Sequence, residues 1–201
     1  MGGRLLNERQ TDRAEIARLT SGILGDYLDF FDNTAFADHA DWSGCYCMFF
    51  HCESPFDGQA KANRDLAADY IRAGRQQGYL AYLDGKVVGW LNANDKSVFC
   101  RLTARSELWD GEERDKKIKA FVCILIAPEM RGRGIASSLL ERAQADAAAE
   151  GYDLAEGYPF LEGDAFDNYH GPYALFVKNG FSEIKRFKDD CLMRKDLRAG
   201  M

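Results

Sequence analysis

The sequence Arg131-Gly132-Arg133-Gly134 has the residue types and the spacing of an anion-binding turn. An apolar run over residues 121–126 precedes it, and such a run is typical of a strand covered on both faces. From Ile135 onward, small and apolar residues recur at helical spacing. A helix N-terminus offers free N–H groups, and arginine side chains suit phosphate geometry. The pattern therefore predicts a phosphate-binding turn between a buried strand and a helix.

Two other interpretations of this turn stay open. Gly132, Gly134 and Ser137 could form a dinucleotide fingerprint, but its third position carries serine and no strand–helix alternation precedes it. The turn could also be a plain tight turn with solvated arginines. An ATP-binding P-loop is excluded, because the Gly-Lys-Ser/Thr sequence that it needs is missing.

Length and composition restrict the class of protein. The 201 residues, 46% hydrophobic and 29% charged, are typical of a single globular domain with one core. The net charge of −6 argues against nucleic acid or an anionic membrane as the main partner. The longest apolar run, residues 120–127, is too short to span a membrane, and no signal-like segment opens the chain. We therefore expect a cytoplasmic protein whose six cysteines are free thiols.

The elements that must position the turn can be assigned from periodicity and turn residues. Asp84-Gly85 lies between two apolar runs and predicts a hairpin over residues 79–91. Helices are expected over residues 11–23, with an extension to Phe31, and over residues 60–77. We also expect strands at residues 4–8, 153–158, 181–187 and 191–195, and a short helix from Gly171-Pro172 to Asn179.

Two motifs, in this order along the chain, resemble signatures of the GNAT superfamily of acyl-CoA-dependent N-acetyltransferases. Residues 131–136 match the pattern Arg/Gln-x-x-Gly-x-Gly/Ala, and residues 174–181 resemble the second signature, usually written Leu-Tyr-x-Lys-x-Gly-Phe. The resemblance implies an α/β (α+β) fold, with a central mixed, mostly antiparallel twisted sheet flanked by helices. It implies one domain over residues 1–201. Residues 1–78 would form its acceptor side, and residues 79–198 its CoA-binding core.

The resemblance also implies a reaction. An acetyl group would pass from acetyl-CoA to a primary amine of a small molecule or peptide, by direct attack in a ternary complex and without a metal. Two alternatives stay open: a non-catalytic acyl-CoA sensor and a nicotinamide-dependent enzyme. A homodimer also stays open. The residues expected to bind acetyl-CoA are Ile124, Ile126, Arg131, Gly132, Arg133, Gly134, Ile135, Ala136, Ser137 and Phe176.

The transfer needs a base for the amine and benefits from an acid for the CoA thiolate. The family often supplies that acid as a tyrosine at the position of Phe176, and phenylalanine cannot donate a proton. Tyr173, three residues earlier on the same short helix, and His170 are therefore the predicted acids, with Tyr169 as a further candidate. Glu156 is the predicted base, because a carboxylate on an otherwise apolar strand has its pKa raised by burial.

The acceptor wall is expected between the first two helices, where Trp42, Cys45, Cys47 and His51 lie. If that stretch is extended, the two cysteines and the histidine share one face. Tyr158 is expected to join this wall. The spacing matches no established zinc pattern, so we expect no metal and buried thiols with aromatic packing. A nucleophilic cysteine paired with histidine is the alternative.

Overall fold

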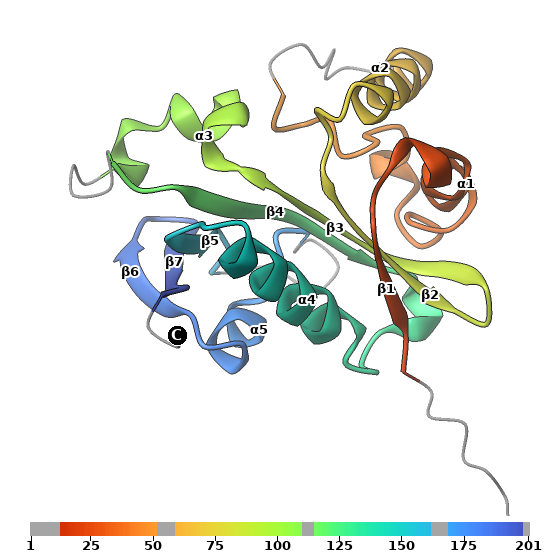
Figure 1. The fold of residues 1–201 in the computed structure, drawn as a ribbon. Coiled ribbons are helices and arrows are strands. Elements are labelled where there is room, and N and C mark those ends of the chain that lie inside the picture. The colour runs from red at the N-terminus through yellow and green to blue at the C-terminus, as the bar shows by residue number, and fades with distance from the viewer. Residues whose placement is uncertain (1–12, 52–58, 110–114, 162–168, 199–201) are drawn as a thin grey trace, which may run out of the picture.

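The computed structural model describes residues 13–51, 59–109, 115–161 and 169–198 (Figure 1). These residues form a seven-stranded sheet in the order β1-β2-β3-β4-β5-β7-β6. The strands are β1 Glu15–Arg18, β2 Gly78–Leu83, β3 Lys86–Asp95, β4 Ile118–Ile126, β5 Leu154–Gly157, β6 Ser182–Arg186 and β7 Cys191–Asp196. The helices are α1 Leu24–Asn33, α2 Ala60–Arg72, α3 Cys100–Thr103, α4 Ile135–Ala149 and α5 Tyr173–Lys178.

The predicted fold class is confirmed. Neighbouring strands within the described ranges are antiparallel except β4 and β5, which run parallel. Figure 1 shows α1 and α2 on one side of the sheet and α4 and α5 on the other. None of the helices in these ranges is both long and apolar enough to cross a membrane.

The predicted hairpin is present as β2 and β3. Asp84 and Gly85 both have positive φ angles, 49° and 75°, as the tight turn between twisted antiparallel strands requires. The long helix before it also forms, but it ends at Arg72 instead of Gln77. Gly74, with φ of 70°, follows its C-cap and provides the left-handed residue that stops the helix.

The first predicted helix is wrong over residues 15–18, whereas its extension to Phe31 is confirmed as part of α1. Residues 15–18 form the edge strand β1, in which Glu15 pairs with Tyr82 and Arg18 with Tyr79. Pairing with the edge of β2 outweighs a weak helical pattern, and the helix begins only at Leu24. The predicted strand at residues 4–8 and the expected helix start at Thr11 lie outside the described residues.

The sheet opens where β4 parts from β5. The two strands pair only from Ile118 with Leu154 to Phe121 with Gly157. On its other side, β4 stays paired with β3 as far as Ile126, past a bulge that follows Asn92. The C-terminal half of β4 therefore has one edge that β5 does not cover.

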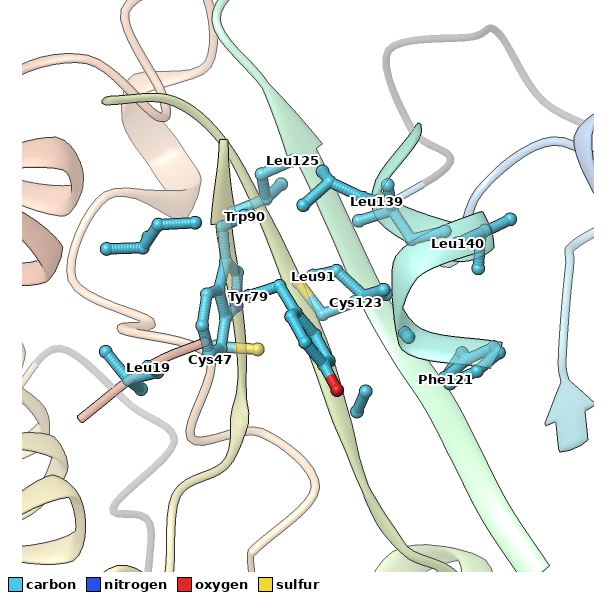
Figure 2. Packing of buried hydrophobic residues seen from close by; sticks show 14 of the residues in the cluster. Leu19, Cys47, Tyr79, Trp90, Leu91, Phe121, Cys123, Leu125, Leu139 and Leu140 are labelled. Carbon is cyan, nitrogen blue, oxygen red and sulfur yellow. The ribbon is translucent and has the colours of Figure 1, made fainter. Parts of the chain in front are cut away.

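The core that supports this opening spans both sides of the sheet. Figure 2 shows Trp90 beside Cys47, with Phe121, Leu139 and Leu140 on the α4 side, where the Tyr79 hydroxyl also bonds Asp146 of α4. Trp90 is 0% exposed and meets the Tyr27 ring edge-on, with the ring centroids 4.9 Å apart. The C-terminal half of β4 is thus held by close packing.

Candidate functional site

A cavity of about 470 Å³ lies along the open edge of β4, and we call it the turn cavity. Residues of β4, of the turn before α4, of α4 and of α5 line it together with residues of the loop after α1. Eight of the ten residues predicted to bind acetyl-CoA are among them: Ile124, Ile126, Arg131, Gly132, Gly134, Ile135, Ala136 and Ser137. Arg133 is exposed and not part of this lining, and neither is Phe176.

The start of α4 in this cavity has the features of an anion site. Gly134 is the N-cap, with φ of 81°, and no side chain caps the helix. A Cβ atom added at Gly132 or Gly134 would meet no heavy atom of the chain within 4 Å. The turn thus leaves open space in front of backbone N–H groups at the positive end of the helix dipole.

Arg131 is held at the rim of the turn cavity. Its guanidinium donates two hydrogen bonds to Asp38, at 2.6 and 3.2 Å, and Nε donates to the carbonyl of Ile126 at 3.3 Å. The hydrogen bond from Arg131 lowers the pKa of Asp38, so this carboxyl stays charged. Asp38 therefore fixes the predicted phosphate-binding arginine in one place.

The uncovered edge of β4 forms a hydrogen bond with the segment that precedes α5. The N–H of Ile124 donates to the carbonyl of Tyr169 at 2.7 Å. The N–H of Ala127 points the other way, to Val88 on β3, so the alternation of the strand turns the N–H of Ile126 to the open edge as well. The backbone groups predicted to pair with the pantetheine arm do face the turn cavity, and one of them already has a hydrogen-bond partner.

A second cavity, of about 660 Å³, adjoins the first, and we call it the thiol cavity. Cys45, Cys47 and Cys123 line it, among mostly aromatic and small side chains. Its other lining residues are Phe36, Asp41, Trp42, Ser43, Gly44, Phe49, Gln59, Ala60, Asn63, Leu125 and Tyr169. Four residues, Phe36, Trp42, Leu125 and Tyr169, line both cavities, so the two meet at the open edge of β4.

The predicted acceptor wall is only partly assembled. Trp42 and Cys45 line the thiol cavity, but His51 and Tyr158 do not. Residues 40–51 fold as successive turns, so Cys45 and His51 do not share the face that an extended strand would give them. His51 is buried, with Nε2 3.0 Å from Oε1 of Gln76. The hydroxyl of Tyr158 donates to Glu156 at 2.7 Å.

Glu156, the predicted base, is 0% exposed and surrounded by positive charge. Its carboxylate lies 2.8 Å from Nζ of Lys96 and 2.8 Å from a guanidinium nitrogen of Arg194. It lines neither the turn cavity nor the thiol cavity. With two cations and the Tyr158 hydroxyl around it, the carboxylate has the surroundings of a buried structural ion pair.

The two predicted acids lie on different sides of α5. Tyr173 contacts β6, where its hydroxyl bonds Glu183 and its ring lies 6.0 Å from the guanidinium carbon of Arg186. His170 is 6% exposed and packs against the rings of Phe160 and Tyr169. Burial lowers the pKa of His170 to about 4, so its imidazole is neutral at pH 7. Neither residue lines the two cavities.

Several residues at the junction of the cavities were not singled out by the motifs. Tyr169, only a further candidate in the sequence, lines both cavities, and burial raises its pKa to about 12. Phe36 and Asp38 come from the loop after α1, and no pattern in that loop pointed to a site. Cys123 could have been found, because it alternates with Leu125 along the central strand and shares its face.

The cysteines differ in state. Cys45, Cys47, Cys123 and Cys191 are free thiols, as predicted, but Cys100 takes part in a disulfide, so the expectation of six free thiols is wrong. Across residues 13–51, 59–109, 115–161 and 169–198, no group of three or more His, Cys, Asp or Glu residues could hold a metal ion.

Comparison with known proteins adds a family and a fold. A family model described as "Acetyltransferase (GNAT) family" matches residues 37–159. A search of curated protein sequences finds no match. The ring of Phe176 is 0% exposed, and a Cβ added at Gly157 would lie 2.1 Å from it. Phe176 therefore packs in the core against the backbone of Gly157.

Solved structures share the fold at low sequence identity. An N-acetyltransferase from Staphylococcus aureus Mu50 is 17% identical, with a TM-score of 0.56 over 92% of this chain and 99% of that chain. An apo agmatine N-acetyltransferase variant is 12% identical, with a TM-score of 0.60 over 92% and 100%. A PaiA N-acetyltransferase from Thermoplasma acidophilum in complex with coenzyme A is 14% identical, with a TM-score of 0.54 over 91% and 98%.

Proposed function

The chain belongs to the acetyltransferase (GNAT) family, and from this premise we propose that it transfers an acetyl group from acetyl-CoA to a primary amine. The observation that carries the proposal is the meeting of two cavities at the open edge of β4. One has an uncapped helix N-terminus suited to a pyrophosphate, and the other has aromatic walls suited to an acceptor. Their junction lets the amine attack the thioester directly in a ternary complex.

In this proposal the turn cavity holds acetyl-CoA. The N–H groups at the start of α4 and the guanidinium of Arg131 bind the pyrophosphate, and the edge of β4 at Ile124 and Ile126 pairs with the amides of the pantetheine arm. An N–H group of the same β4 edge would donate to the thioester oxygen as it gains negative charge. Residues 79–198 form the CoA-binding core, and the N-terminal part supplies most of the acceptor wall.

Tyr169 is the acid that this geometry favours for the departing CoA thiolate. Its side chain lines both cavities, and its raised pKa of about 12 keeps the hydroxyl protonated at neutral pH. Glu156, Tyr173 and His170 remain predictions of catalytic residues, but none of them reaches the junction through the described lining.

We expect the acceptor to be an amine with an apolar body. Four aromatic side chains line the thiol cavity, and Asp41 is the one carboxylate among its described lining residues. Acetylation of 2-phenylethylamine should therefore exceed that of spermidine by about tenfold or more in kcat/KM, because the additional ammonium groups of spermidine lose hydration without a matching anion. Thiol release from acetyl-CoA measures both rates.

Three results, from thiol release, CoA binding and thermal stabilisation, would contradict the proposal at different points. A preference for spermidine would contradict the apolar acceptor but keep the acetyltransferase. Tight CoA binding without thiol release across a broad amine panel would favour an acyl-CoA sensor. Thermal stabilisation by NAD but not by CoA would favour a nicotinamide-dependent enzyme and remove the CoA site itself.

The cofactor end of the turn cavity can be tested with two matched glycines of α4. Gly134 begins the helix and Gly151 follows its end, both have positive φ (81° and 77°), and a Cβ at either would meet no atom of the chain. Alanine should therefore destabilise the fold by a similar ~1–2 kcal/mol at each position. Only Gly134→Ala should also weaken CoA binding, by about tenfold or more, because its Cβ enters the anion site. Calorimetric titration with CoA measures the difference, and equal affinities in the two variants would contradict this binding mode.

A further inference from the structure

The proposed reaction lacks a base, and the thiol cavity contains a candidate that no motif marks. We propose that Cys47 takes the proton from the ammonium group of the acceptor. This inference rests on the proposed acetyl transfer and adds to it a catalytic residue.

Cys47 lies on the floor of the cavity where the acceptor would bind. It is 2% exposed, yet it lines the thiol cavity together with Cys123 of β4. Figure 2 shows its side chain beside the Trp90 ring, with Cys123 on the neighbouring strand. Cys123 immediately precedes Ile124, whose N–H faces the turn cavity, so the pair of thiols lies close to the junction of the two cavities.

The backbone at Cys47 is held in an unfavourable conformation. Tyr46 and Cys47 have φ angles of 44° and 54°, a region that residues with a Cβ rarely adopt and that costs about 1–3 kcal/mol each. Surrounding contacts maintain it: the hydroxyl of Tyr27 donates to the Tyr46 carbonyl at 2.7 Å, and the hydroxyl of Tyr46 donates to Asp32 at 2.5 Å. Strain maintained in this way next to a cavity points to a side chain that has to be placed there.

The sulfur of Cys47 accepts a hydrogen bond from an amide nitrogen, an atom that donates and does not accept. Nδ2 of Asn92, on β3, lies 3.2 Å from Sγ of Cys47. Asn92 is 0% exposed, and its Oδ1 has no hydrogen-bond partner in the described part of the chain. The amide thus directs its N–H to the sulfur, and a hydrogen bond of this kind favours the thiolate over the thiol.

The two thiols differ in acidity for this reason. Burial raises the pKa of Cys47, but its neighbours Cys123, Trp90 and Asn92 outweigh burial, and the result is a lowered pKa. The neighbouring Cys47 thiol, followed by burial, raises the pKa of Cys123 well above its usual value. Cys47 therefore loses its proton before Cys123 does.

The titratable groups around Cys47 come from four elements. Cys45 belongs to the same loop, Cys123 to β4, Tyr27 to α1, and Tyr169 to the segment before α5. Burial raises the pKa of Cys45 to about 11 and that of Tyr169 to about 12. Cys47 is consequently the most easily ionised of these groups, which suits it to act as the base.

The protons of the step balance without a further reactant. The Cys47 thiolate takes one proton from the ammonium, and the free amine attacks the thioester carbon. A C–N bond forms, the C–S bond breaks, and the CoA thiolate takes a proton from Tyr169. The second proton of the attacking nitrogen returns to Tyr169, and Cys47 releases its proton to solvent. One proton is released per amide formed.

The direct test replaces Cys47 with serine, which keeps the size of the side chain but does not ionise in this pH range. With 2-phenylethylamine as acceptor, Cys47→Ser should lower kcat/KM by about 100-fold or more at pH 7.5 and leave CoA affinity unchanged. The wild-type rate should rise with pH as Cys47 ionises, and the variant should lose that rise. Cys191→Ser is the control, because Cys191 is a buried thiol outside both cavities. Wild-type-like kcat/KM in Cys47→Ser would overturn the proposal.

Two measurements by mass spectrometry do not need an acceptor. At pH 7.5, iodoacetamide should alkylate Cys47 faster than the more exposed Cys45 of the same cavity and faster than Cys191, whose pKa burial raises to about 11. Slower alkylation of Cys47 than of Cys45 would overturn the thiolate. An acetyl adduct on Cys47 after incubation with acetyl-CoA alone would overturn its role as a base and make it a nucleophile. If the wild type acetylates no amine, the proposed function fails, while alkylation still tests the thiolate.

Discussion

Replacing Glu156 with glutamine is expected to lower the free energy of unfolding by about 3–5 kcal/mol, the range for removing one partner of a buried ion pair. Glu156 is 0% exposed and lies 2.8 Å from both Lys96 and Arg194. The side chain of Lys96 is itself only 1% exposed, so water cannot replace the lost carboxylate. The buried ammonium of Lys96 and the partly exposed guanidinium of Arg194 would then face a neutral amide.

Urea denaturation of the full chain measures this change, and two variants control it. Glu183→Gln removes a carboxylate from an ion pair with the exposed Arg186 and should change stability little. Adding Lys96→Met to Glu156→Gln should recover part of the loss, because it removes one of the two cations that contact Glu156. If Glu156→Gln unfolds like the wild type but loses turnover, the carboxylate acts as the base predicted from the sequence and not as a structural charge.

His170 is expected to make the fold acid-sensitive over a defined pH range. Its folded pKa of about 4 lies below the unfolded value of about 6.5, so protons bind the unfolded chain first. Stability from the neutral imidazole is complete above pH ~6.5 and is lost progressively as pH falls to ~4. The loss reaches about 3 kcal/mol, since each unit of pKa difference corresponds to ~1.4 kcal/mol.

The effect is isolated by measuring, at each pH, the difference in the free energy of unfolding between the wild type and a variant of His170. His170→Phe should suit the aromatic surroundings of Phe50, Phe160 and Tyr169, and it should not lose this part of its stability on acidification. His170→Gln keeps a polar, non-titrating side chain and should also lack the acid-dependent loss. Parallel unfolding curves for wild type and both variants between pH 6.5 and 4 would show that His170 is protonated equally in the folded and unfolded states.

The order of elements and the turn before α4 could be predicted because their signals are local. The positive φ angles of Asp84, Gly85 and Gly134 follow from residue type, and the apolar run of β4 indicates a covered strand. The edge strand β1 could not be predicted, since four residues of mixed polarity carry little pattern and their conformation depends on pairing with β2.

The candidate site was only partly predictable because its side chains meet across long sequence separations. An isolated carboxylate on an apolar strand fits a base and a buried ion pair equally well, and only the positions of Lys96 and Arg194 distinguish them for Glu156. In the same way, no local pattern places Asn92 against the sulfur of Cys47, 45 residues away in the sequence. Motifs identify the backbone that binds the cofactor, whereas charge and proton transfer depend on tertiary contacts.

The hydrogen bond between the N–H of Ile124 and the carbonyl of Tyr169 has a consequence for the energetics of cofactor binding. A pantetheine amide that pairs with Ile124 exchanges with a bond that is already made, so the contact itself adds little net affinity. Most of the binding free energy should then come from the nucleotide end, at the start of α4. We therefore expect 3′,5′-ADP to compete well with CoA for this protein, and pantetheine to compete poorly.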